Sequence, residues 1–251
     1  MKNSSFAGVL WGLTAAFAGA SIAGCGQINL DRLPAESRPM VEASLTAGES
    51  AMRLDDVEVI EGVAVVTTYD DNQAGLVRAQ RITVYPSSGD IEAVGRLPGG
   101  TWTADVGLRG GRVRTHDDAV LSDEQAEAIE QYLRLILHRL RGGINFLDGS
   151  ERIASATDVF VTCRSLHRIV TTCRDELPCA YFFDKKARRL HMVTKGDYEI
   201  PGAGTVTLYG KPCSIDGVCL PTCLEVMEMG ANSFFGSRKV LSVRFENLRV
   251  H

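Results

Sequence analysis

The feature that most constrains this chain is a long succession of short segments with the pattern of β-strands, interrupted by one helical segment. Residues 57–69 and 76–85 are rich in Val, Ile, Thr and Tyr, and in the second segment Ile82 and Val84 alternate with polar residues. The residues 70–75 between them, DDNQAG, have the composition of a hairpin turn. Similar segments continue to residue 250, separated by Gly, Pro and Asp, so we predict roughly ten or more antiparallel strands.

The segment 122–141 predicts one long helix. Ser122 and Gln125 have the spacing of a capping box, in which each side chain bonds to the backbone amide of the other. Two glycines, residues 142 and 143, mark its end. Apolar residues recur at steps of three and four and define one broad face, which includes Ile129, Leu133, Ile136, Leu137 and Leu140.

These elements predict a mainly β (α+β) fold. An antiparallel sheet must bury one face, either against helices or against a second layer of strands. A single long helix in the middle of the sequence favours a strongly curved sheet, a half-barrel with the helix as its lid. We expect residues 41–251 to form a single domain of this kind, with a short helix somewhere within 40–54.

The first 25 residues predict an export signal. Lys2 is followed by an uncharged stretch, residues 6–22, which is marginal for a membrane span of about 20 residues. Ile22-Ala23-Gly24-Cys25 resembles the bacterial lipobox, which implies that residues 1–24 are removed and that Cys25 carries lipid. An ordinary signal peptidase cut near Ala23 is the alternative.

The lipobox interpretation implies anchoring by two or three acyl chains at a membrane surface, which gives stable attachment without a spanning helix. Residues 25–40 contain two prolines and mixed charge, and we expect them to be the lipidated tether. Residue 26 is Gly rather than Asp. In a host with two membranes this implies the periplasmic face of the outer membrane.

The other six cysteines lie in the C-terminal third of the chain. In an oxidising compartment thiols tend to pair, and six cysteines allow fifteen connectivities. Three disulfides, fewer disulfides with buried thiols, and a metal site remain open, but no C-x-x-C motif is present, so we expect no metal or cofactor. The candidates are Cys163, Cys173, Cys179, Cys213, Cys219 and Cys223.

The sequence offers few catalytic candidates. It has no G-x-S-x-G, H-E-x-x-H or P-loop motif, and His116-Asp117-Asp118 is best interpreted as a solvated loop before the helix cap. The net charge of −4 and the absence of a basic run exclude a typical nucleic-acid binder. We therefore expect a protein without enzymatic activity.

The order of elements in the C-terminal half resembles the lipoprotein-sorting carriers of the LolA/LolB type and the mycobacterial lipid-binding lipoproteins that share their fold. The resemblance depends on Tyr181-Phe182-Phe183-Asp184 before a turn, the strand at 190–194, the hairpin Ile215-Asp216-Gly217-Val218-Cys219-Leu220-Pro221 and the closing strand 243–250. It implies an incomplete barrel whose concave apolar interior holds acyl chains.

From this resemblance we expect a membrane-anchored protein that binds a lipid or lipoprotein acyl chain. The helix residues Ile129, Leu133, Ile136, Leu137 and Leu140 would then form a cavity wall, or else belong to an ordinary packed core. The alternative function is a disulfide-stapled envelope surface or assembly protein with a filled core and no ligand. The oligomeric state is not predicted.

Overall fold

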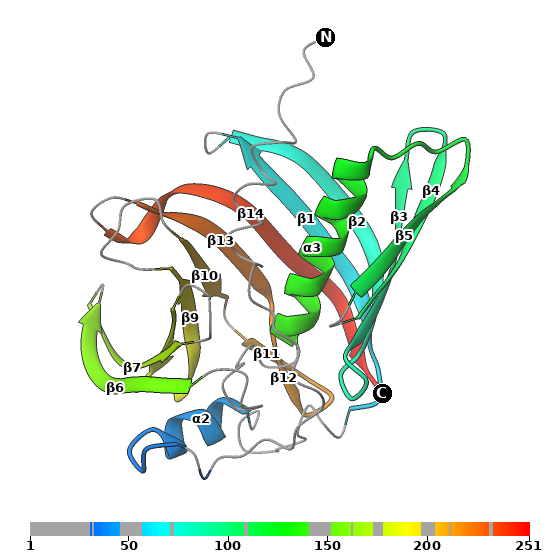
Figure 1. Cartoon of the computed structure of the whole chain (residues 1–251). Coiled ribbons are helices and arrows are strands. Elements are labelled where there is room, and N and C mark those ends of the chain that lie inside the picture. The colour runs from blue at the N-terminus through cyan, green and yellow to red at the C-terminus, as the bar shows by residue number, and fades with distance from the viewer. Residues whose placement is uncertain are drawn as a thin grey trace.

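The computed structural model contains two helices and fourteen strands in the part of the chain that it describes (Figure 1). The described residues are 31, 33–45, 57–70, 73–107, 110–140, 152–161, 163–172, 178–196, 204–210, 212–230 and 233–251. The helices are α2 (Arg38–Leu45) and α3 (Asp123–Leu140). The first five strands are β1 (Ile60–Asp70), β2 (Gln73–Tyr85), β3 (Asp90–Leu97), β4 (Gly100–Gly107) and β5 (Gly110–Asp117).

The remaining strands follow α3. They are β6 (Arg152–Val161), β7 (Arg164–Thr172), β8 (Cys179–Asp184), β9 (Arg189–Lys195), β10 (Thr205–Tyr209), β11 (Pro212–Ile215), β12 (Val218–Pro221), β13 (Cys223–Gly230) and β14 (Ser233–Val250). Neither described helix is long and apolar enough to cross a membrane.

Twelve strands form one antiparallel sheet in the order β5-β4-β3-β2-β1-β14-β13-β10-β9-β8-β7-β6. The long β14 pairs with β1 on one side and β13 on the other, so it joins the two halves of the sheet. The sheet curves strongly and is not closed, since β5 and β6 lie at its two ends (Figure 1). The predicted mainly β half-barrel is confirmed.

The predicted helix is also confirmed, and the capping box forms. Ser122 Oγ accepts a hydrogen bond from the Gln125 amide at 3.2 Å, and Gln125 Oε1 accepts one from the Ser122 amide at 3.2 Å. The helix packs against β3, β4 and β5, across the concave side of the sheet (Figure 1). The five side chains predicted for its apolar face are all fully buried: Ile129, Leu133, Ile136, Leu137 and Leu140.

The short helix α2 begins at Arg38, before the expected end of the tether at residue 40. Leu33, Ser37 and Val41 are buried against the sheet, and α2 contacts β8 and β9. Part of the predicted tether therefore belongs to the folded domain.

Both helices cover the same face of the sheet. Tyr181 on β8 pairs with Val193 on β9, which pairs with Thr207 on β10, which pairs with Val226 on β13. Directly paired residues point to the same face, so this row runs continuously from the strands under α2 to those under α3. Tyr209 lies two residues along β10 from Thr207, on the same face, and contacts the apolar clusters beneath both helices.

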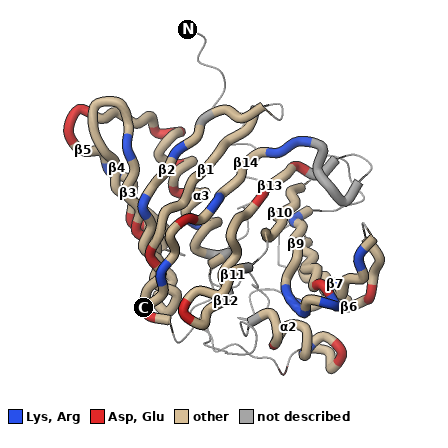
Figure 2. The backbone as a smooth tube through the Cα atoms, turned by 180° about the vertical axis from the view of Figure 1, so that it is seen from behind, with Lys and Arg blue, Asp and Glu red and all other residues tan. Residues whose placement is uncertain are grey.

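The predicted hairpin at Asp216-Gly217 is present as well. Both residues have positive φ, 49° and 82°, which is the geometry of a two-residue type I′ turn between β11 and β12. Seen from behind, charges of both signs are spread along the strands rather than gathered by sign (Figure 2).

Candidate functional site

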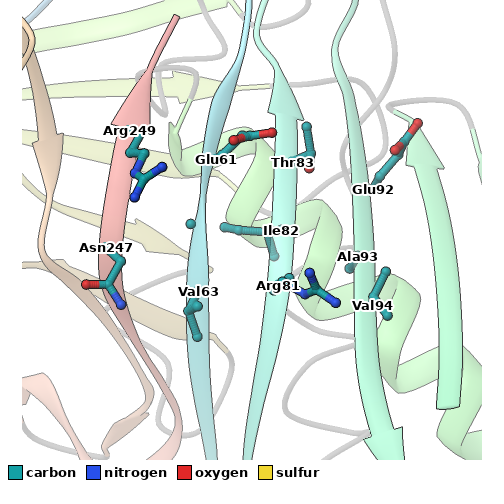
Figure 3. Close-up of a pocket in the computed structure, with 11 residues that line it drawn as sticks. Glu61, Val63, Arg81, Ile82, Thr83, Glu92, Ala93, Val94, Asn247 and Arg249 are labelled. Atoms are coloured by element: carbon teal, nitrogen blue, oxygen red, sulfur yellow. The ribbon is translucent and has the colours of Figure 1, made fainter.

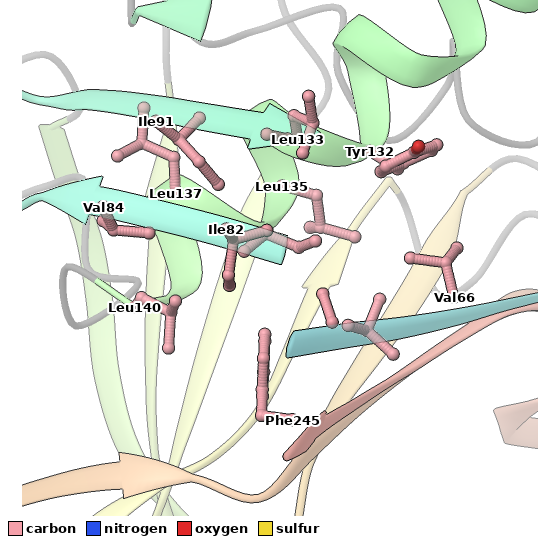
Figure 4. Close-up of a cluster of buried hydrophobic side chains, with 14 of the residues drawn as sticks. Val66, Ile82, Val84, Ile91, Tyr132, Leu133, Leu135, Leu137, Leu140 and Phe245 are labelled. Carbon is pink, nitrogen blue, oxygen red and sulfur yellow. The ribbon is translucent and has the colours of Figure 1, made fainter. Parts of the chain in front are cut away.

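The concave face of the sheet is the candidate site, and α3 covers its larger half. The helix contributes seven buried side chains to an apolar cluster, among them the five predicted for a cavity wall, and they interleave with apolar residues of the sheet (Figure 4). The sheet side of this cluster includes Ile60, Val66, Ile82, Val84, Ile91, Trp102, Val106, Leu224, Val226, Leu241, Val243 and Phe245. The structure thus places the predicted side chains between helix and sheet, while their role toward a ligand stays a prediction.

A hydrogen-bonded pair of polar side chains, Tyr132 and Gln80, lies inside this apolar region. Tyr132 on α3 donates a hydrogen bond to Gln80 Oε1 on β2 at 2.7 Å, and both side chains are buried. Burial raises the pKa of the Tyr132 phenol, so this hydroxyl remains a donor. Among the described residues, Gln80 Nε2 has no hydrogen-bond partner. An unpaired buried donor costs about 1–3 kcal/mol, so this amide can stabilise a ligand carbonyl or a water molecule.

The helix α2 covers the part of this same face of the sheet that lies on β8 and β9. Beneath it lie Ile169, Tyr181, Phe183, Leu190 and Val193, and the segment contributes only Leu33 and Val41 to the buried cluster. Two hydrogen bonds add to this contact: Ser37 Oγ with His167 Nε2 at 2.8 Å, and the Leu190 amide to Ser44 Oγ at 2.7 Å.

The first of these bonds belongs to a Ser–His–Asp chain that sequence analysis missed. His167 Nδ1 lies 2.8 Å from Asp158 Oδ1, so the chain has the connectivity of a hydrolase triad. Ser37 directly precedes α2, His167 lies on β7 and Asp158 on β6, and Ser37 and His167 are 130 positions apart. No spacing signal connects them in the sequence.

The surroundings of Ser37 do not suit a nucleophile. Its side chain is fully buried, and the adjacent helix start offers no oxyanion donors. The Arg38 amide is bonded to Pro34 O and the Met40 amide to Ser37 O, and Pro39 has no amide hydrogen. We conclude that the hydrogen bonds linking Ser37, His167 and Asp158 anchor α2 to the sheet.

The Asp158 end of this hydrogen-bonded series is exposed and charged. Lys185 forms an ion pair with Asp158, and hydrogen bonds from Lys185 and then His167 lower the pKa of the Asp158 carboxyl. The ionised carboxylate orients the His167 ring, so that Nε2 faces Ser37.

Replacing Ser37 with alanine should loosen α2. It leaves His167 Nε2 buried without a partner, at a cost of about 1–3 kcal/mol. We expect faster hydrogen exchange at the amides of residues 38–45, with little change in α3. Ser165→Ala, an exposed serine at the start of β7, is the matched control. Equal protection of α2 in the two variants would contradict an anchoring role.

The other predicted residues are not brought together into a chemical site. His116 lies at the exposed edge strand β5, where its Nε2 meets Thr103 Oγ1 at 2.9 Å. Across the described ranges, no three His, Cys, Asp or Glu residues are grouped to hold a metal.

The described cysteines lie in different environments. Cys163 is exposed, Cys213 and Cys223 are half-buried, and these three form no disulfide with another described residue. Cys179 is half-buried at the start of β8. Cys25 and Cys173 lie outside the described residues, as does the side chain of Cys219. In the β11–β12 hairpin Cys213 is paired across the strands with Leu220, and Cys219 is paired with Ser214. The two cysteines are therefore not directly opposite each other. Disulfide pairing among the six cysteines stays a prediction.

Comparisons with known proteins give structural neighbours only. No model of a known protein family matches the chain, and no curated protein matches it. The chain is similar to a DUF1329 family protein from Desulfovibrio piger, at 12% identity and a TM-score of 0.46, over 78% of this chain and 87% of that one. It is similar to a LolA superfamily protein from Nitrosomonas europaea, at 9% identity and a TM-score of 0.44, over 87% and 94% of the two chains.

A third solved structure, the MucA/MucB complex of Pseudomonas aeruginosa, matches at 14% identity and a TM-score of 0.25, over 78% of this chain and 53% of that one. A LolA superfamily protein is therefore among the structures to which this chain is similar, as the sequence resemblance predicted.

Proposed function

We propose that this protein is an exported, membrane-anchored lipoprotein that binds a lipid or a lipoprotein acyl chain on the concave face of its half-barrel, without catalysing a reaction. The observation that carries the proposal is the nature of that face. It is apolar on both sides of Tyr209. The two described helices that cover it differ in how much apolar side chain each packs against the sheet.

We infer the place of entry from the difference in buried contact between the two helices. Burying one aliphatic side chain contributes about 1.5–3 kcal/mol. The helix α3 contributes seven buried side chains to its apolar cluster, whereas the α2 segment contributes only Leu33 and Val41 to its own. Displacing α2 therefore costs much less than displacing α3, and it would uncover an apolar floor with two aromatic rings, Tyr181 and Phe183.

A long acyl chain would continue from this floor toward α3. Tyr209 contacts both clusters, so it lies at the junction of the two halves. Beyond it lie the predicted wall residues Ile129, Leu133, Ile136, Leu137 and Leu140. The amide of Gln80 on the same face would bond an ester or amide carbonyl of the ligand.

The proposed anchor lies close to this entry. Leu33 comes eight residues after Cys25, and at about 3.3–3.6 Å per residue even a fully extended tether reaches less than about 30 Å. A lipidated Cys25 would therefore hold α2 next to the membrane from which a ligand enters.

The anchor predicts a large effect of one substitution. Cys25→Ser removes the sulfur that forms the thioether, so the protein should move from the membrane fraction to the soluble fraction. Fractionation followed by immunoblotting measures this, with Cys163→Ser, an exposed thiol, as the control. A Cys25→Ser protein that stays membrane-bound would exclude lipid anchoring at this residue.

The ligand is tested on protein lacking residues 1–25. Organic extraction followed by mass spectrometry should find co-purified lipid, and a fluorescent fatty-acid probe should bind. Val193→Phe, which adds volume to the cluster under α2, should weaken probe binding at least fivefold. Val94→Phe places the same side chain on the outer face and should leave binding unchanged. Absence of both lipid and probe binding would overturn the proposal.

That negative result would favour the alternative, an envelope assembly protein with a filled core. The observation on its side is the complete burial of the α3 face.

A further inference from the structure

A groove on the opposite, outer face of the sheet is not used by the proposed function. It is half-open, has a volume of about 450 Å³ and crosses the four strands β14, β1, β2 and β3 (Figure 3). It lies where the pairing of β1 with β14 shifts between Glu61 and Val63, at a bulge whose residue Asn247 has a φ of 53°. Bulges of this kind bend a strand and redirect its side chains.

The groove is lined by charges of both signs in equal number. Glu61 and Glu92 supply two carboxylates, and Arg81 and Arg249 supply two guanidinium groups. Within the described ranges, Arg81, Glu92 and Arg249 have no ion-pair partner, and the partner of Glu61 is His251 Nε2 at 3.8 Å. Charged groups in a groove with no protein partner are available to a ligand.

The strand register places these charges in a defined pattern. Glu61, Thr83 and Glu92 are directly paired across β1, β2 and β3, so neighbouring backbones lie about 4.8 Å apart. The Thr83 hydroxyl is thus flanked by two carboxylates, and Figure 3 shows the Glu61 carboxylate directed toward Thr83.

The next row along the strands has a different character. Arg81 lies two residues, about 6.6 Å, along β2 from Thr83, between the apolar side chains of Val63 and Val94. Figure 3 shows the Arg81 guanidinium directed toward Val94. The row of Thr83 therefore holds two carboxylates with Arg249 on β14 paired to Glu61 at its end, and the next row holds Arg81 between apolar walls.

We propose that this groove binds a small zwitterion, in which a primary ammonium is joined through a short linker to a phosphate or carboxylate. The ammonium donates to Glu61, Glu92 and Thr83, and the anion accepts from Arg81. The linker lies against Val63 and Val94. A ligand with one sign of charge would meet two like charges in the groove, whereas a zwitterion is complementary to both pairs.

The proposal is tested with the full chain purified in dodecyl maltoside. O-Phosphoethanolamine is titrated and its ³¹P resonance followed, and saturable binding in the millimolar range or tighter is expected. Phosphocholine has the same charges but no ammonium hydrogens to donate, so it should bind at least fivefold more weakly. No saturable binding of O-phosphoethanolamine, or equal binding of the two compounds, would overturn the proposal.

Variants of exposed residues locate the site without threatening the fold. Arg81→Gln and the double change Glu61→Gln with Glu92→Gln should each weaken binding at least tenfold. Arg96→Gln is the matched control, since Arg96 is exposed two residues beyond Val94 on β3 and does not line the groove. Equal affinities in all three proteins would exclude the groove as the site.

A vesicle-binding experiment distinguishes a lipid headgroup from a free soluble zwitterion as the natural ligand. Protein freed of detergent is added to phosphatidylcholine vesicles with or without phosphatidylethanolamine. Binding that increases with phosphatidylethanolamine and falls with Arg81→Gln identifies a lipid headgroup. Binding of the soluble compound alone identifies a free zwitterion, and both results support the groove.

Discussion

Replacing Gly95 with alanine should lower the free energy of unfolding by about 3 kcal/mol, the upper end of the range for overpacking in a core. Gly95 on β3 is paired directly with Trp102 on β4, and the indole ring lies over the glycine. A Cβ atom at residue 95 would come within 2.4 Å of Trp102 Cε2. The ring is 1% exposed and enclosed by the α3 cluster, so it has little room to move away.

Chemical denaturation measures this effect, and Gly110→Ala is the matched control. Gly110 also lies in a strand, β5, but a Cβ there would meet nothing within 4 Å. Its replacement should change stability by less than about 0.5 kcal/mol, as is usual for exposed positions. A double variant with Trp102→Leu should recover part of the loss caused by Gly95→Ala. Equal stability of the two alanine variants would show that the ring is not packed on Gly95.

Truncating Leu137 to alanine should cost about 2–5 kcal/mol, the range for a fully buried leucine in a packed core. Leu137 is 0% exposed and lies on the face of α3 that contacts the sheet (Figure 4). The cost combines lost transfer free energy with the cavity that remains after incomplete relaxation. The measurement is urea denaturation of protein freed of lipid by organic extraction and refolding.

Glu127→Ala on the exposed side of α3 is the control, and it should change stability by a few tenths of a kcal/mol. The size of the Leu137 effect also distinguishes the two interpretations of the helix face. A side chain that borders an empty ligand cavity loses fewer contacts on truncation than one in a filled core. A cost below about 1 kcal/mol would contradict the packed arrangement and favour a cavity wall under α3.

Local patterns carried much of the fold prediction. The alternation in β2, the turn residues Asp216 and Gly217 and the capping pair of Ser122 and Gln125 each depend on neighbours within a few positions. Such interactions are set by backbone geometry and side-chain reach, so they can be inferred without knowing the rest of the chain. The choice of a curved sheet around a helix followed because only one long amphipathic helix was available to cover the strands.

The candidate site was predicted only in part. The burial of Leu133 and its neighbours on α3 follows from their periodicity. The anchoring of α2 does not, because Ser37 meets His167 only after β7 has taken its place in the sheet. The outer groove likewise needs Arg81, Glu92 and Arg249 from three strands to come together, and the bulge at Asn247 depends on the pairing of β14 with the distant strand β1.

The sequence by itself determined the strand and helix content, the turns that connect them and the side of α3 that is buried, because each is a property of residues close together in the chain. Only the tertiary structure decided that α2 shares the concave face with α3, that Trp102 covers Gly95 and that opposite charges line one groove. These depend on the register of strands far apart in the sequence, and that register results from how the whole sheet packs.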